Sequence, residues 1–207
     1  MSNVRLVWVT PNAEDMIAYM ARVSNPSNQN NQDTAPKLLK YLMKHKHWSP
    51  FEMVNVCMEI ETTRDIARQI IRHRSFSFQE FSQRYADVNS FEKAETRMQD
   101  HKNRQNSLPN NDEALDLWWQ EQQARILYKT QEAYEKALEH GIAKEVARKI
   151  LPEGLTMSRM YMNGTLRSWI HYCDIRTDPA TQKEHREVAD QAQEILRELF
   201  PNVFDRG

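Results

Sequence analysis

The scarcity of glycine limits which nucleotide-binding folds this chain can form. Its 207 residues contain only four glycines, Gly141, Gly154, Gly164 and Gly207. A dinucleotide-binding fingerprint or a phosphate-binding loop needs closely spaced glycines, because the backbone must approach the phosphates. Neither motif can be written with these positions, so a Rossmann or P-loop site is excluded. Any phosphate that this protein binds must be held by side chains and helix N-termini.

Length, charge and cysteine content set further limits. The length suits one domain with a hydrophobic core, and we expect a single domain over residues 1–207. The 28 Lys and Arg residues balance the 29 Asp and Glu residues, whereas proteins that bind nucleic-acid backbones are basic. No apolar run approaches membrane-spanning length, and the first residues lack the apolar core of a signal peptide. Two cysteines, Cys57 and Cys173, make no metal-binding Cys-x-x-Cys motif. We therefore expect a cytoplasmic protein without metal, membrane or nucleic-acid partner.

The hydrophobic pattern predicts an α+β fold, with a small antiparallel sheet flanked by helices. Strands are expected at 4–9 and 54–61, with extended chain at 155–162 and a turn at Asn163-Gly164. Helices are expected from Thr10-Pro11, at 34–46, from Thr62 or Thr63, at 112–140, 145–151 and 166–175, and from Asp178-Pro179 to Phe200. Residues 87–111 are charged and irregular, so we expect a surface insertion there.

The predicted helix at 112–140 is long for so small a chain. Asn111 or Asp112 can cap its start, and Gly141 can end it. Apolar residues line one side, among them Leu115, Trp118 and Ile126. One domain cannot easily cover that much apolar surface, so we expect this helix to lie at subunit interfaces.

Residues 72–85, RHRSFSFQEFSQRY, concentrate cations and aromatic rings. Arginine forks bind phosphate, and rings can cover the faces of a planar ligand. The mixture therefore suits a site for a planar, phosphorylated ligand. It equally suits a helix end with exposed cations that is followed by a half-buried strand, and composition alone favours neither interpretation.

The spacing of this stretch resembles the signature of the flavin-dependent thymidylate synthases, in which Arg-His-Arg is followed after seven residues by Ser. Further blocks resemble the family in the same order: Ala21–Ser24 (ARVS), 41–47 (YLMKHKH), Ser49–Glu52 (SPFE), Ala67–Gln69 (ARQ), 145–152 (EVARKILP) and 166–176 (LRSWIHYCDIR). The resemblance covers about residues 21–190. Several ordered blocks are more specific than one motif.

The resemblance implies that dUMP is converted to dTMP. The expected one-carbon donor is methylenetetrahydrofolate, the cofactor is FAD, and NADPH is the reductant. It also implies an α+β fold and a homotetramer whose sites combine residues of more than one subunit. We expect a cytoplasmic location, either bacterial or in the host cytoplasm if a phage encodes the chain.

Family positions also imply roles for individual residues. Flavin contacts are expected from Ser24, His47, Ser49, Glu52, Arg72, His73, Arg74, Gln79, Glu80, Arg167 and His171. Contacts to dUMP are expected from Gln69, Arg72, Glu80, Phe81, Ser82, Gln83, Arg84, Arg148 and Arg176. We assign catalytic roles to Arg72, Ser82 and Arg176. The chain departs from the family at Thr165, where asparagine is usual, and at Ala180, where histidine is frequent, so details of flavin contact there are open.

Simpler interpretations compete at several of these positions. Ser24 can merely end a helix, and the pair His45 and His47 suggests a metal only if a third ligand lies nearby. Ser82 is a better phosphate ligand than nucleophile, because the nearest base in the sequence, His73, lies on another element. Neither cysteine sits where a nucleophile is expected.

Three other functions fit parts of the pattern. A flavin-dependent hydroxymethylase acting on dUMP or dCMP would use the same residues. Interleaved arginine and aromatic residues also suit a single-stranded nucleic-acid-binding module, although the near-neutral charge disfavours it. A catalytically silent homologue is disfavoured because the Arg-His-Arg, Ser and Arg set is complete.

Overall fold

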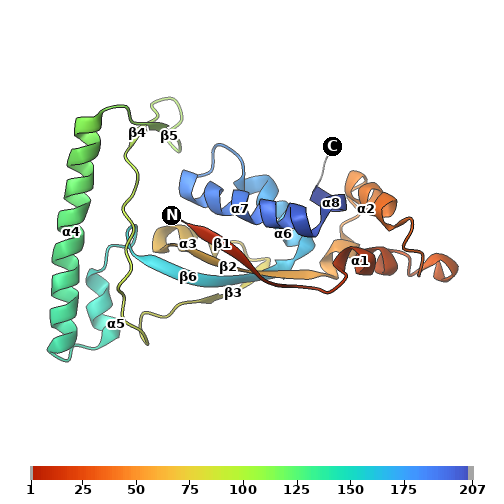
Figure 1. Cartoon of the computed structure of the whole chain (residues 1–207), viewed down its shortest axis with the longest axis horizontal. Helices are drawn as coiled ribbons and strands as arrows, with labels where there is room; N and C mark the ends of the chain where they lie inside the picture. The colour runs from red at the N-terminus through yellow and green to blue at the C-terminus, as the bar shows by residue number, and fades with distance from the viewer. Residues whose placement is uncertain (1, 205–207) are drawn as a thin grey trace.

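The computed structural model describes residues 2–204, which form an α+β fold around a four-stranded antiparallel sheet (Figure 1). The strand order is β1-β2-β6-β3. Their bounds are β1 Asn3–Val9, β2 Asn55–Thr63, β6 Met157–Thr165 and β3 Phe76–Glu80. The predicted fold class is thus confirmed. None of the helices within 2–204 is long and apolar enough to cross a membrane.

One face of the sheet packs against the helices. Along β6, Ser158, Met160 and Met162 are buried, whereas Arg159 and Tyr161 are exposed, which is the alternation of a half-covered strand. Figure 1 shows α6 and α7 over the covered face. Their bounds are α6 Leu166–Arg176 and α7 Lys183–Leu199.

Buried apolar residues fill the space between this face and the helices. Trp169 of α6 is fully buried, and its indole nitrogen donates a 3.0 Å hydrogen bond to the Val56 carbonyl. Because the indole N–H needs a partner when buried, this bond fixes the ring over the sheet. Helix α6, which follows β6 in the chain, is therefore held against the neighbouring strand β2.

A second group of helices covers one end of the sheet. These helices are α1 Ala13–Ala21, α2 Ala35–Lys44 and α8 Pro201–Phe204; a 3₁₀ turn, Pro26–Asn28, lies between α1 and α2, and another, Ser49–Glu52, leads from α2 to β2. They pack on one another and on α7, which joins them to the main core. The predicted helix at 34–46 is present.

The prediction that Thr10 caps the first helix was wrong. Asn12 is the N-cap instead, with a left-handed φ of 50° that asparagine tolerates better than most residues. Thr10 belongs to the sheet, because its hydroxyl accepts a 2.9 Å hydrogen bond from the Asn55 backbone N–H. The last helix likewise begins later than predicted, at Lys183, because the Asp178 carboxylate accepts a hydrogen bond from the Ala180 backbone N–H and forms a turn.

The prediction of a turn at Asn163-Gly164 was also wrong, because β6 runs through both residues. Gly164 pairs with Val56 on one side and with Phe76 on the other. A Cβ atom at Gly164 would lie 2.4 Å from Cδ1 of the Phe76 ring. The glycine therefore permits a close approach of strand and ring rather than a turn.

Residues 87–111 contain short regular elements where none were expected. The strands β4 Arg97–Gln99 and β5 Ser107–Pro109 form a separate two-stranded sheet. Asp100 orders the connecting loop, since its carboxylate accepts hydrogen bonds from the backbone N–H groups of Lys102 and Asn103. Polar side chains rather than an apolar alternation build this hairpin, which is why the hydrophobic pattern did not predict it.

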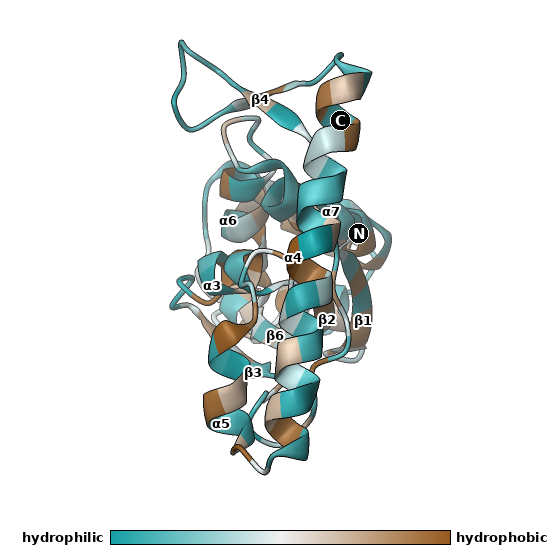
Figure 2. Cartoon of the chain, turned by 90° about the vertical axis from the view of Figure 1, so that its left-hand side faces the viewer, coloured by the Kyte–Doolittle hydropathy of each residue, from teal (hydrophilic) through white to brown (hydrophobic). Residues whose placement is uncertain are grey.

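The long helix α4, Glu113–Glu139, stands along one side of the molecule (Figures 1 and 2). Asp112 is its N-cap and accepts hydrogen bonds from the N–H groups of Ala114 and Leu115, as the sequence predicted. Of this helix only Gln123 and Tyr134 are buried. Tyr134 packs with Val88 and Ala147 in a small second core.

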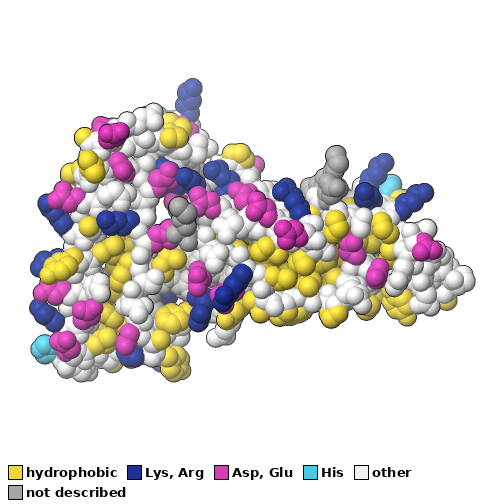
Figure 3. Space-filling model, in the orientation of Figure 1, with side chains coloured by type: hydrophobic (Ala, Val, Ile, Leu, Met, Phe, Trp, Pro, Cys, Tyr) yellow, Lys and Arg dark blue, Asp and Glu magenta, His cyan; other side chains and the backbone are white. Residues whose placement is uncertain are grey.

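Much of the apolar surface of α4 is uncovered in the single chain. Leu117 is 71% exposed, Tyr128 67% and Trp118 54%. Figure 3 shows hydrophobic side chains reaching the surface over α4 and over β1. Beyond α4 the chain continues through α5 Lys144–Ala147 and a 3₁₀ turn, Arg148–Ile150, so the helix predicted at 145–151 is shorter than expected.

Candidate active site

The Arg72–Arg74 turn connects the short helix α3, Arg64–Ile70, to β3. The His73 backbone N–H donates to the Ile70 carbonyl, which ends the helix and leaves Arg72 and Arg74 exposed. The His73 side chain turns inward and meets the Tyr172 ring edge-on, with the ring centroids 5.0 Å apart.

Arg176 connects this turn to the end of α6. Its Nε donates a 2.9 Å hydrogen bond to Nε2 of His73. Residues from two separate sequence blocks, Arg-His-Arg and LRSWIHYCDIR, thus meet at one place. His73 and Arg176 are in direct contact, and Arg72 precedes His73 in the turn.

His73 is a neutral hydrogen-bonding group at this site rather than a cation. Burial lowers its pKa to about 4, and the positive charge of Arg176 and the neighbouring His171 and Arg72 add to the effect. Its Nε2 accepts a hydrogen bond from Arg176, so its Nδ1 carries the hydrogen of the neutral ring. Positive charge at this turn therefore comes from the arginines alone.

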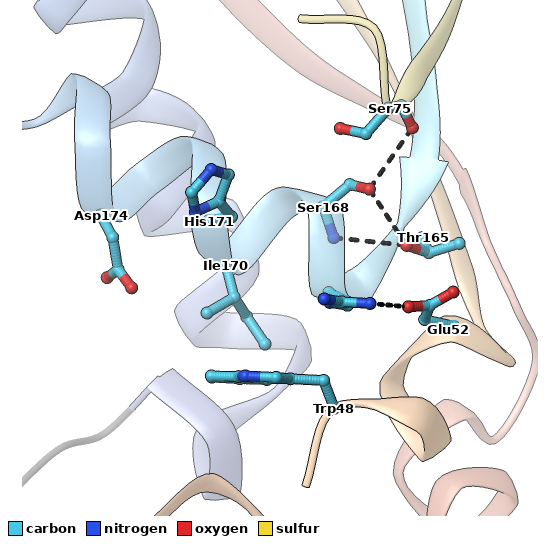
Figure 4. A pocket seen from close by; sticks show the side chains of 9 residues that line it. Trp48, Glu52, Ser75, Thr165, Ser168, Ile170, His171 and Asp174 are labelled. Carbon is cyan, nitrogen blue, oxygen red and sulfur yellow. Dashed lines mark hydrogen bonds and ion pairs between the residues drawn. The ribbon is translucent and has the colours of Figure 1, made fainter. Parts of the chain in front are cut away.

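A cavity of about 530 Å³ lies beside the turn, at the start of α6 (Figure 4). Glu52 and Arg167 form an ion pair at one side of it. The ring of Trp48 and the side chain of Ile170 supply an apolar part, as Figure 4 shows. This combination of charge and flat apolar surface suits a planar ligand with polar edges.

Thr165 and Ser168 close the cavity on the side of the sheet. The Thr165 hydroxyl accepts a hydrogen bond from the Ser168 backbone N–H and thereby caps α6. The Ser168 hydroxyl in turn donates to the Ser75 carbonyl. The departure from the family at Thr165 thus has a local function as a helix cap.

Three of the predicted flavin residues line this cavity, namely Glu52, Arg167 and His171. Thr165, where the chain departs from the family, also lines it, and sequence reasoning missed the remaining residues: Trp48, Ser75, Ser168, Ile170 and Asp174. All of them lie inside or next to the recognised blocks, so their position in the sequence was the available signal.

A second group of predicted residues lies at the far end of β3. Arg84 forms a 3.5 Å ion pair with Glu145, the residue that begins the block containing Arg148. Glu80 accepts hydrogen bonds from Ser158 and from Arg64, at 2.8 and 3.3 Å. These contacts hold the segment after β3 against β6 and α5.

The same segment contains Phe81, Ser82 and Gln83. The Ser82 hydroxyl accepts a weak hydrogen bond from the Arg84 backbone N–H. Gln83 is 4% exposed, and its side-chain N–H group has no hydrogen-bond partner among residues 2–204. A buried amide without a partner is costly, so this N–H is suited to a ligand or another chain.

Within one chain the two groups are separated. The five residues of β3 span about 16 Å between them.

Gln79 points to the sheet face opposite Phe76 and Phe78, and Ser24 lies in the exposed loop after α1. The exposed His47 precedes Trp48, and its ring meets that of Tyr41 edge-on and lies tilted to that of His45. No cluster of three potential metal ligands exists in the described part of the chain.

The neutral histidines of this region make folding stability depend on pH. Burial, with a smaller effect from the positive charge of Arg176, lowers the pKa of His185 to about 3, against about 6.5 in the unfolded chain. The unfolded state therefore binds more protons between pH 6.5 and pH 4. We expect the free energy of unfolding to fall as pH falls through this window, by roughly 2–3 kcal/mol for each of His73 and His185. For His73 this figure already includes a discount, because its side chain is partly exposed to solvent.

This expectation can be checked by urea unfolding between pH 7 and pH 4. His185→Asn should flatten the decline, whereas the matched control His101→Asn, at an exposed histidine of the hairpin loop, should keep it. An unchanged decline in His185→Asn would show that other groups cause it.

Comparison with known proteins agrees with these features. The family model described as thymidylate synthase complementing protein matches residues 5–202. The flavin-dependent thymidylate synthase of Synechocystis sp. is 54% identical over 190 residues, covering 92% of this chain and 87% of the relative. The probable flavin-dependent thymidylate synthase of Paramecium bursaria Chlorella virus 1 is 52% identical over 192 residues, covering 92% and 88%.

A solved structure shares the whole fold. The UMP/dUMP methylase PolB from Streptomyces cacaoi, bound with 5-Br dUMP, superposes with a TM-score of 0.87 at 26% identity, covering 99% of this chain and 93% of that one. The residues that carry the sequence signature, the sheet that supports them and the relatives all agree, and this chain belongs to the flavin-dependent thymidylate synthase family.

Proposed function

We propose that the protein methylates dUMP to dTMP, with methylenetetrahydrofolate as one-carbon donor, FAD as cofactor and NADPH as reductant. The observation that carries the proposal is the contact between His73 and Arg176, which unites two signature blocks beside one cavity. The names of the relatives and the dUMP analogue bound to the structural neighbour support the substrate.

The residues around the cavity fit a flavin. Arg72 and Arg74 are exposed forks suited to a pyrophosphate, and the cavity offers Trp48 as a flat neighbour for a ring system. Arg167, paired with Glu52, can donate hydrogen bonds to ring oxygens. We assign Ser24, His47, Ser49, His73, Gln79, Glu80 and His171 to the same cofactor on family positions. When bound, the flavin supplies reducing equivalents, while the protein supplies position and electrostatics.

The nucleotide site combines both groups of residues described above. We propose that Arg84, Arg148 and Arg176 bind the phosphate, helped by Ser82 and by backbone N–H groups, and that Gln69 binds the base. Arg72 faces both ligands. Because Arg176 and Arg84 lie at opposite ends of β3 in one chain, a complete site requires residues from another subunit.

We therefore propose a cytoplasmic homotetramer in which α4 and the open sheet face contact other subunits. Exposed apolar side chains that gather on one element are typical of protein interfaces, and α4 exposes Leu117, Trp118 and Tyr128. Light scattering should report a tetramer for the wild type and smaller species for Trp118→Glu with Ile126→Glu. A monomer in an active wild-type preparation would contradict the proposal.

The chemistry needs no cysteine in this proposal. Cys57 is 7% exposed and Cys173 is fully buried, and burial raises the pKa of the Cys57 thiol, so neither is a ready nucleophile. Cys57→Ser with Cys173→Ser should lose about 1–3 kcal/mol of stability, from buried hydroxyls. Turnover per folded, flavin-loaded subunit should stay within roughly threefold of wild type. A thousandfold loss would indicate a cysteine nucleophile.

The cofactor assignment is tested by the visible spectrum. Purified protein should be yellow, or become yellow when FAD is added, and Arg72→Ala with Arg74→Ala should release the flavin. A colourless protein that binds no added FAD would contradict the assignment.

A further inference from the structure

A continuous series of hydrogen bonds lies behind the Arg72–Arg74 turn. Tyr172 and His185 are both fully buried, and the Tyr172 hydroxyl lies 3.2 Å from Nε2 of His185. Nδ1 of His185 lies 3.3 Å from Oε1 of Gln69, and Nε2 of Gln69 lies 2.8 Å from Oε1 of Gln182. Gln182 then donates to the Glu184 carboxylate at 3.1 Å.

Glu184 sets the direction of this series. An ionised carboxylate can only accept hydrogen bonds, so Gln182 must present its N–H group to Glu184 and its oxygen to Gln69. Gln69 must then present its own N–H group to Gln182 and its oxygen to His185.

The remaining two groups follow from that order. His185 donates from Nδ1 and accepts at Nε2, where the Tyr172 hydroxyl donates. In the reverse direction the buried Tyr172 hydroxyl would lose its acceptor, and the oxygen of Gln182 would face the Glu184 carboxylate.

Two further features keep this arrangement in place. The Arg97 guanidinium binds Glu184 at 2.5 Å, which holds the carboxylate in place and connects the hairpin of residues 97–109 to the series. The pKa of His185 is lowered to about 3 by burial, so the ring stays neutral, with one donor and one acceptor nitrogen.

Because the side-chain amide of Gln69 is oriented in this way, one of its N–H bonds remains available to a ligand. The oxygen of Gln69 is taken by His185, and one of its N–H bonds is taken by Gln182. The second N–H bond of Gln69 has no partner among the hydrogen bonds of residues 2–204. Gln69 can therefore offer a ligand a hydrogen-bond donor but not an acceptor.

We propose that Tyr172, His185, Gln182 and Glu184 are positioning residues that hold Gln69 as a donor and thereby make the site select uracil over cytosine. Uracil presents a carbonyl oxygen at position 4, whereas cytosine presents an amino group there, which would face the Gln69 N–H donor to donor. This inference rests on the proposed function, in which Gln69 binds the base of dUMP. A site built to hydrogen-bond one group rejects a ligand that lacks it, because its own polar group is left unpaired.

The test compares the binding of dUMP and dCMP to flavin-loaded protein by calorimetry. Wild type should prefer dUMP by at least about a hundredfold. Glu184→Gln with Tyr172→Phe keeps the shapes but removes both the carboxylate and the hydroxyl that fix the direction, so the preference should fall by roughly tenfold or more. Each single variant should give a smaller fall. Glu187→Gln, one turn further along α7, is the matched control and should keep the wild-type preference.

The ratio of the two affinities separates positioning from a structural role. A structural role would weaken dUMP and dCMP together and leave their ratio unchanged, and that result in the folded double variant would overturn the inference. Equal binding of both nucleotides to the wild type would also overturn it. If the wild type makes dTMP while the ratio is insensitive to these variants, only this inference fails; if it binds no dUMP, the proposed function fails with it.

Discussion

Replacing Arg176 with alanine should weaken dUMP binding by about ten- to hundredfold while the flavin stays bound. Charge-assisted hydrogen bonds contribute about 1.5–3 kcal/mol each, and Arg176 lies at the end of α6 with only its Nε committed to His73 in the hydrogen bonds of the described residues. Loss of the cation also removes a charge that lowers the pKa of His73, so this pKa should rise in the variant.

Calorimetry with dUMP and the flavin spectrum together measure this outcome. Arg197→Ala is the matched control, because Arg197 is exposed and its guanidinium binds Gln193 on the same helix. If Arg176→Ala released the flavin and left dUMP affinity unchanged, the assignment of Arg176 to the nucleotide would be reversed.

Gly164→Ala should lower the free energy of unfolding by about 3 kcal/mol, or prevent folding. The new Cβ would lie 2.4 Å from the Phe76 ring, closer than any real Cβ contact. The ring cannot move aside easily, because Trp169 and Tyr172 pack against it with centroids 4.9 and 6.0 Å away. Overpacking of this kind costs about 1–3 kcal/mol or more, since the strand and the ring must both shift.

Gly154→Ala is the matched control for this substitution. The nearest atoms to a Cβ at Gly154 are those of Asp65 at 3.9 Å, which is ordinary contact. Urea unfolding should show the wild-type midpoint for Gly154→Ala and a clear decrease for Gly164→Ala. Equal midpoints would show that the strand at Gly164 has more room than its contact with Phe76 indicates.

Local signals in the sequence predicted most of the secondary structure correctly. Asp112 was recognisable as a helix cap because its side chain acts within its own first turn. Gly164 was misread because a glycine after asparagine is typical of a turn, whereas here the reason for glycine is a ring on a neighbouring strand. A contact between distant segments leaves no mark in the local pattern.

The same contrast between local signals and contacts of distant segments holds for the residues of the candidate site. Motif spacing singled out Arg72, His73 and Arg176, and the structure contains a hydrogen bond between the last two. It gave no sign that His185, a single histidine on an amphipathic helix, lies against Gln69 from a segment more than a hundred positions earlier. Nor could it show that Arg84 and Arg176 occupy opposite ends of β3 in one chain.

Product analysis is the sharpest test of the proposal that this chain uses a reduced flavin to methylate dUMP. Flavin-loaded protein incubated with dUMP, methylenetetrahydrofolate and NADPH should form dTMP, identified by mass spectrometry, and omission of the reductant or of the folate should abolish it. Formation of 5-hydroxymethyl-dUMP, or the absence of dTMP from folded, flavin-loaded protein, would contradict the claim.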